Sequence, residues 1–296
     1  MRDLHRARAR PGGTGTDPAL AARGRAIDPV LILAVAAGAF AGHLYTRLRK
    51  PPKPYRITAD LEYWVFVPKA ELPPQDQVME SLIAAPALEP AHHLLLSDVR
   101  LHVGLATREK NALSFRPDVL GEGAETLMDR LADCQGFFRV RFLADKLGAE
   151  RRHLVYLPYL AYAYGRLGGA LVVADRAMGR AYSFEDFGTY LKDRKRPDRF
   201  ADHVAVDWIP EEEGGHAQTR GMGKLGLPEL LSPRVAKDEE RIVTALLEEY
   251  AERLWRDGAV PDSREFDMFE DGFLVEPHGP QKRGVVSVRM RRTQTN

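Results

Sequence analysis

The amino-acid sequence predicts an α+β fold, a mainly antiparallel sheet with covering helices, preceded by one N-terminal transmembrane helix. Three observations support this prediction. Apolar and polar residues alternate with a period of two in several short segments, one apolar stripe runs along 236–257, and one long apolar run occupies 29–45. Because strands and helices are interspersed without the regular rhythm of βαβ units, antiparallel pairing is favoured over a doubly wound parallel sheet.

The N-terminal segments are predicted from their composition. Residues 1–28 are rich in Arg, Ala, Gly and Pro and hold almost no large apolar side chain, so we expect a disordered basic tail. The next segment, 29–48, is the predicted transmembrane anchor. A helix over 29–45 would rise about 26 Å, slightly less than the hydrocarbon core of roughly 30 Å, so the flanking residues must help it to span. The proline-rich segment 49–54 is a stiff linker to the folded part.

The basic residues around the apolar run predict its orientation. More of them follow the run than precede it within about twenty residues, so the positive-inside rule places the C-terminal part in the cytoplasm. A signal peptide cleaved near Ala39 to Ala41 and a buried helix are the alternatives. The long leader and the cationic flank favour a retained anchor. The basic residues counted are Arg10, Arg23 and Arg25 before the run, and Arg47, Arg49, Lys50, Lys53 and Arg56 after it.

Residues 55–296 are predicted to form a single α+β domain. Its first strand runs from 57 to 67, where every second residue is apolar. The longest helix covers 236–257, since its apolar stripe is closed by Gly258. The other predicted helices lie at 75–84, 122–134 and 153–167, and a short one follows a capping box at Ser183 to Asp186. The other predicted strands lie at 99–105, 138–142, 170–174, 203–209, 271–275 and 285–290. A loop is expected at 211–215.

A hydrolase-type pocket near residues 202–229 is one functional hypothesis. Carboxylate and imidazole groups that converge within hydrogen-bond reach could serve as an acid and a base. No G-x-S-x-G elbow marks an activated serine. The segment from Gly221 to Gly226 has the letters G-x-G-x-x-G, but no helix follows it, so we interpret its glycines as backbone turns. The candidate catalytic residues are Asp207, Glu211, His216 and Glu229.

Composition and histidine spacing exclude other classes of site. The chain has 43 Lys and Arg against 42 Asp and Glu, so no excess charge directs it to nucleic acid. Cys134 is the only cysteine, which excludes an internal disulfide and any CxxC site. Adjacent His92 and His93 would point to opposite faces of a strand and lack a spaced partner. No metal and no cofactor are therefore predicted.

Two groups of basic residues are candidate binding sites. Arg139 and Arg141 lie on the polar side of one predicted strand, and Arg100, Arg289 and Arg291 on the polar sides of others. If those strands are neighbours, a cationic sheet face results, which suits an acidic partner. The second group is a loop that could contact anionic lipid headgroups, with a solvated loop as the alternative. Its basic residues include Lys192, Arg194, Lys195 and Arg196.

Two motifs carry a resemblance to a known family. An apolar helix runs into Gly168-Gly-Ala-Leu-Val-Val173, and Thr219-Arg-Gly-Met-Gly-Lys-Leu-Gly-Leu-Pro-Glu229, a T-x-G-x-x-x-x-G-x-P-E pattern, precedes the long amphipathic helix. In this order of features the chain resembles a family of bacterial domains of unknown function. The resemblance implies one α+β domain and supplies no catalytic residue. Together, these observations predict a single-pass inner-membrane protein whose α+β domain binds another protein, with a hydrolase as the alternative.

Overall fold

The computed structural model describes residues 55, 57–83, 98–145, 151–193, 198–260, 267–268 and 273–292. The described residues belong to one compact unit, 54–296. Within these ranges no helix is both long enough and apolar enough to cross a membrane. Several predictions fall outside the described residues: the tail at 1–28, the anchor at 29–48, the linker at 49–54, His92 and His93, and Arg194, Lys195 and Arg196 of the basic loop.

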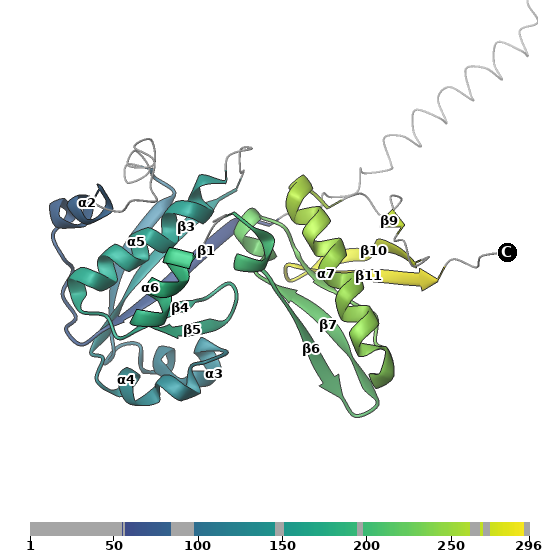
Figure 1. Ribbon diagram of the computed structural model, residues 1–296, viewed down its shortest axis with the longest axis horizontal. Coiled ribbons are helices and arrows are strands. Elements are labelled where there is room, and N and C mark those ends of the chain that lie inside the picture. Colours follow the sequence, from purple (N-terminus) through teal and green to yellow (C-terminus); the bar gives the residue numbers. More distant parts are fainter. Residues whose placement is uncertain are drawn as a thin grey trace, which may run out of the picture. The chain divides into compact units, whose positions relative to one another are not determined.

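The predicted α+β class, with antiparallel strands and covering helices, is confirmed, but the strands form two sheets (Figure 1). The first sheet has the order β2-β3-β1-β4-β5, and every neighbouring pair in it is antiparallel. In its centre Tyr63 lies opposite Val140 and Val65 opposite Phe138. Its strands are β1 (Ala59–Val67), β2 (Leu101–Thr107), β3 (Gly136–Ala144), β4 (Val172–Asp175) and β5 (Arg180–Ser183).

One face of the first sheet is covered by α5 (Arg152–Gly168), with α2 (Gln75–Ile83) and α6 (Phe184–Asp193) beside it. Glycines at the end of α5 permit this close packing, because a Cβ on Gly168 would lie 2.6 Å from the Phe138 ring. The helix cap of the predicted capping box is present at the start of α6, but the Asp186 carboxylate bonds to the Ser183 hydroxyl, where a full box would use the Ser183 backbone N–H. The Ser183 hydroxyl accepts the Asp186 backbone N–H at 3.0 Å and contacts its carboxylate at 2.6 Å.

Short helical segments cover one end of the opposite face. They are η2 (Ala112–Phe115), α3 (Pro117–Leu120), η3 (Glu125–Leu127) and α4 (Met128–Ala132), and they enclose a second core around Phe66 and Phe137. The sequence predicted one helix over 122–134. Helical turns are present from Glu125 to Ala132, as η3 and α4, but they begin later than predicted, because Glu122 is extended beside β5, where its backbone N–H and C=O bond to Gly179 and Ala181.

The second sheet has the order β6-β7-β8-β11-β10-β9 and contains one parallel pair, β8 with β11. Helix α7 (Glu240–Asp257) packs on β6 and β7 (Figure 1). Short 3₁₀ segments are η4 (Phe200–Asp202), η5 (Met222–Leu225) and η6 (Lys237–Glu239). The strands are β6 (Ala205–Glu211), β7 (Gly214–Arg220), β8 (Glu229–Leu231), β9 (Asp267–Met268), β10 (Phe273–Lys282) and β11 (Val285–Arg292).

Strand β7 was not predicted. The turn of the β6–β7 hairpin lies at 212–213, inside the loop expected at 211–215, and the other residues of that loop belong to the two strands. The inward positions of β7 are Gly215, Ala217 and Thr219, which give no apolar alternation in the sequence. Their small size has a structural cause: a Cβ on Gly215 would lie 2.6 Å from the Trp208 ring. Because close packing requires small residues at these positions, the sequence lacks the apolar alternation by which a strand is normally recognised.

Candidate functional site

The turn from Thr219 to Glu229 folds around its own carboxylate. Glu229 accepts hydrogen bonds from the Thr219 hydroxyl at 2.7 Å and from the backbone N–H groups of Gly221 and Gly223 at 2.9 and 3.3 Å. Burial raises the pKa of Glu229, while these hydrogen bonds act to lower it. The backbone donors that a phosphate would need are already occupied, so the glycines here serve as turns, as the sequence predicted.

Lys224, in the same turn, joins the second sheet to the first. Its ammonium contacts the Asp175 carboxylate at 2.6 Å, and the two side chains are 0% and 4% exposed. The other Asp175 oxygen accepts the backbone N–H groups of Ala177 and Met178. Because the Lys224 carbonyl can only accept, His153 Nε2 donates to it at 2.9 Å, and burial lowers the pKa of His153 to about 4. These buried groups form a structural joint between the sheets.

The four candidate catalytic residues do not converge in one place. Asp207 pairs with Arg220 across the β6–β7 hairpin, and Glu229 is enclosed in its turn. Glu211 contacts His216 Nδ1 at 2.9 Å and also Arg234. Of the four, only Glu211 and His216 touch, at the exposed end of the hairpin.

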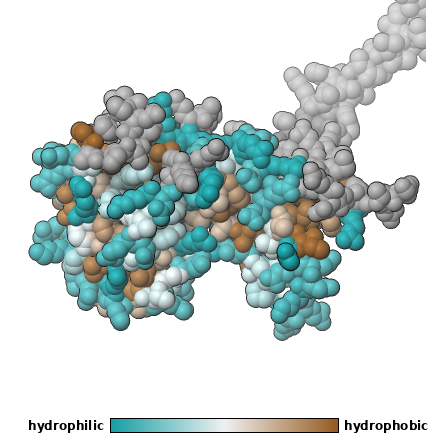
Figure 2. Space-filling view, viewed as in Figure 1, coloured by the Kyte–Doolittle hydropathy of each residue, from teal (hydrophilic) through white to brown (hydrophobic). Residues whose placement is uncertain are grey.

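The described residues also give no support for a metal site or a cysteine nucleophile. They contain no group of three His, Cys, Asp or Glu side chains arranged to hold a metal ion. Burial raises the pKa of the Cys134 thiol to about 12, which disfavours the thiolate that a nucleophile needs. On the face drawn in Figure 2, hydrophobic groups lie scattered among hydrophilic ones.

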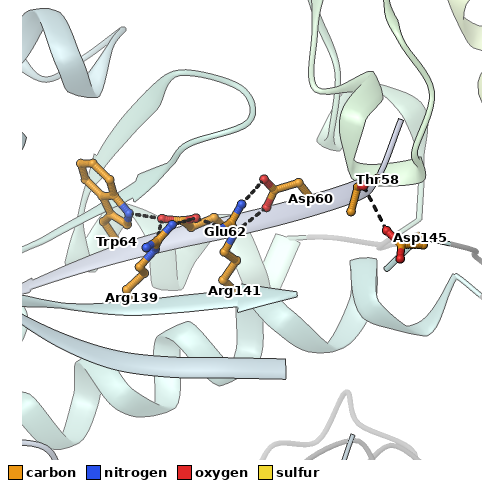
Figure 3. A network of polar contacts seen from close by, with 7 residues as sticks. All are labelled: Thr58, Asp60, Glu62, Trp64, Arg139, Arg141 and Asp145. Carbon is orange, nitrogen blue, oxygen red and sulfur yellow. Dashed lines mark hydrogen bonds and ion pairs between the residues drawn. The ribbon is translucent and has the colours of Figure 1, made fainter. Parts of the chain in front are cut away.

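The face of the first sheet opposite α5 carries charged side chains along β1 and β3 (Figure 3). The helical segments described above cover one end of this face, and Trp64, which contacts Phe137 at 4.8 Å between ring centroids, borders that end. The remainder is partly exposed. We call it the open half of the first sheet, and it consists of Asp60 and Glu62 on β1, His102 and Gly104 on β2, and Arg139 and Arg141 on β3.

Both arginines of the open half are held by carboxylates through two nitrogens each. Arg139 contacts Glu62 at 2.6 and 2.9 Å, and Arg141 contacts Asp60 at 2.8 and 2.6 Å. Arg141 also reaches Glu62 at 3.0 Å, and the Trp64 indole N–H donates to the same carboxylate. In the first pair the Arg139 side chain is 48% exposed and that of Glu62 is 10% exposed, whereas in the second pair Arg141 is 26% and Asp60 41% exposed. The arginine is therefore the more exposed partner only at Arg139.

A hollow of about 360 Å³ lies on this face. Gly104 pairs with Arg139, and His102 with Arg141, across the β2–β3 ladder. Among the described residues, a Cβ on Gly104 would meet no atom within 4 Å, so the missing side chain leaves open space there. The hollow is lined by His102, Val103, Gly104, Arg139, Arg141 and Leu143.

The single cationic face expected from five arginines does not form. Arg139 and Arg141 belong to the first sheet, whereas Arg289 and Arg291 are on β11 of the second sheet and contact Glu276. Arg100 precedes β2 and pairs with Asp98. Strand periodicity shows which residues share a face of one strand, but it does not show which strands are neighbours. Of the other predicted basic group, Lys192 is exposed at the end of α6.

Sequence reasoning did not identify His102, Gly104 or the carboxylates of β1 as parts of a site. The available signal was a glycine inside a strand pattern, which marks a bulge or a place where another group approaches the backbone. Comparisons with protein-family models, with curated proteins and with solved structures find no match to this chain. The resemblance to a bacterial family of unknown function stays a prediction.

Proposed function

We propose that this chain is a membrane-anchored protein whose α+β unit binds an acidic segment of another protein through the open half of the first sheet. The observation that carries the proposal is the pair Arg139 and Arg141, oriented by carboxylates beside an unfilled hollow. Guanidinium groups already fixed by two hydrogen bonds lose little side-chain freedom when they bind a further acceptor, so less of the binding free energy is lost to ordering.

The membrane anchor is supported by the sequence. The apolar run at 29–45 and the cationic flank after it fit a single-pass segment followed by a cytoplasmic domain. Carbonate extraction of membranes from the native cells tests this part. We expect the full chain to stay in the pellet, and its release intact into the supernatant would contradict the anchor.

The hydrolase hypothesis has less support from the geometry. Of its four candidate residues, Asp207 pairs with Arg220 and Glu229 is enclosed in its turn, and only Glu211 and His216 contact each other, at the exposed end of the hairpin. The arginines of the open half, in contrast, border a hollow that is large enough for a side chain of a partner.

Site-specific crosslinking in native cells tests the binding surface. A photoreactive amino acid at position 102 would lie on the open half, and the same residue at position 278 is a matched control, since His278 is also exposed on a strand and contacts an arginine, Arg289. We expect a protein adduct at 102 that is lost when Arg139→Gln is added, and none at 278. Equal adducts at both positions, or none at 102, would contradict the proposed surface.

A further inference from the structure

Gly104 is a glycine that the fold does not require. Glycine weakens the interior of a strand, because it has no side chain to pack and loses more freedom on folding than other residues. Most described glycines have a steric reason, either a positive φ or a neighbour that a Cβ would strike. Among the described glycines, only Gly104 combines an ordinary φ with no atom within 4 Å of an added Cβ.

The space at Gly104 is therefore not explained by the packing of the described residues. Glycines inside strands commonly mark a place where a ligand or another chain comes close to the backbone. Here the space opens directly beside Arg139, the pairing partner of Gly104 across the ladder. We infer that the hollow at Gly104 is a pocket for one acidic side chain of the partner, and this inference rests on the proposed binding function.

The donors around the hollow suit a carboxylate. Arg139 and Arg141 each use Nε and Nη2 on a carboxylate of β1, and their Nη1 atoms make no hydrogen bond to a described residue. A guanidinium group can hold a second acceptor at this remaining nitrogen, because it carries five N–H donors in a planar array. The exposed imidazole of His102 stands next to Arg141 at the rim.

The apolar part of the lining favours a side chain over a free anion. Leu143 and Val103 border the hollow together with the arginines. Such a site can pack the methylene groups of a glutamate while the arginines hold its carboxylate. The chain's own N-terminal tail does not fit, since 1–28 is rich in arginine and would be repelled.

The test uses the full chain in mild detergent and a fluorescent hexaglutamate peptide, with hexaglutamine as the uncharged control. Gly104→Val places a branched side chain in the hollow beside Arg139 and removes no member of an ion pair, and Ser287→Val, at an exposed position of β11, is its matched control. We expect wild type and Ser287→Val to prefer hexaglutamate. Gly104→Val should bind it roughly tenfold more weakly or worse, with an unchanged or higher Tm.

A second pair of variants separates the inference from the proposed function. His102→Glu places a negative charge at the rim, and His278→Glu makes the same change on the second sheet. Loss of binding in His102→Glu but wild-type binding in Gly104→Val would overturn the pocket and leave the binding surface standing. A large fall in Tm for Gly104→Val would show that the glycine is structural and would also overturn the pocket.

The probe also distinguishes the source of the acidic group. Glycerol 1-phosphate serves as a soluble mimic of a lipid headgroup in the same assay. Binding of glycerol 1-phosphate without binding of hexaglutamate would overturn the assignment to a protein side chain. Equal affinity of wild type for hexaglutamate and hexaglutamine would overturn the assignment to an acidic side chain as well. In that case the crosslinking at position 102 would still decide whether a protein partner contacts this face.

Discussion

Replacing Lys224 with methionine would leave the Asp175 carboxylate buried without its charge partner. Both side chains are almost fully buried, and their contact at 2.6 Å joins η5 to the end of β4. Removing one member of a buried ion pair typically costs about 3–5 kcal/mol, since the remaining charge is neither solvated nor neutralised. For a unit of this size each kcal/mol lowers Tm by about 2–4 °C, so we expect a fall of roughly 6–20 °C.

Urea unfolding of a double-mutant cycle measures this effect. Asp175→Asn removes the other charge while the amide oxygen can still accept the N–H groups of Ala177 and Met178. The double variant should lose less stability than the sum of the single variants, with a coupling of about 1–3 kcal/mol. Lys282→Met, at an exposed lysine of β10, is the control and should change stability by less than about 0.5 kcal/mol. A loss of under about 1 kcal/mol for Lys224→Met would refute the reasoning, because the pair would then not hold the sheets together.

Three further predictions concern folding. Burial lowers the pKa of His153 from its ordinary 6.5 to about 4, so on acidification the unfolded chain binds a proton before the folded chain does. The free energy of unfolding should therefore fall by roughly 3 kcal/mol as the pH drops from 6.5 to 4. In His153→Gln the urea midpoint should depend less on pH across that range, and an unchanged pH dependence would contradict this prediction. A Cβ on Gly221 would lie 2.0 Å from the His203 carbonyl oxygen, whereas a Cβ on Gly258 would meet no described atom within 4 Å. Gly221→Ala should therefore destabilise the protein by at least about 2 kcal/mol more than Gly258→Ala in the same assay. Equal losses of stability in the two variants would contradict the clash. Ser183→Ala should cost about 1 kcal/mol through loss of the cap on α6, and a Tm equal to that of wild type would show that the cap contributes nothing.

Much of the fold could be predicted from local patterns. Strands β1 and β3 and helices α5 and α7 match their predicted segments, because each presents a continuous apolar side to a core and so shows a regular period in the sequence. Strand β7 and the start of the helical segment predicted at 122–134 could not be predicted in this way. In both, contacts with distant residues, the Trp208 ring in one case and Gly179 with Ala181 in the other, decide the backbone path.

The candidate site depended even more on distant contacts. The positions of Arg139 and Arg141 on the polar side of a strand followed from periodicity, but their neutralisation by Asp60 and Glu62 depends on the register of β1 with β3. The importance of Gly104 depends on the same sheet, since a strand glycine is informative only when its surroundings are known to be empty.

The amino-acid sequence alone determined the α+β class, the extents of the main elements and the turn role of the glycines between 221 and 226, because these follow from local periodicity and backbone preference. Only the tertiary structure decided that the strands form two sheets, that Lys224 is a buried joint and not a ligand-binding group, and that the arginines stand beside a hollow. The physical reason is that strand order and register join residues tens of positions apart, such as Glu62 and Arg139, and nothing in the local pattern of either segment specifies the other.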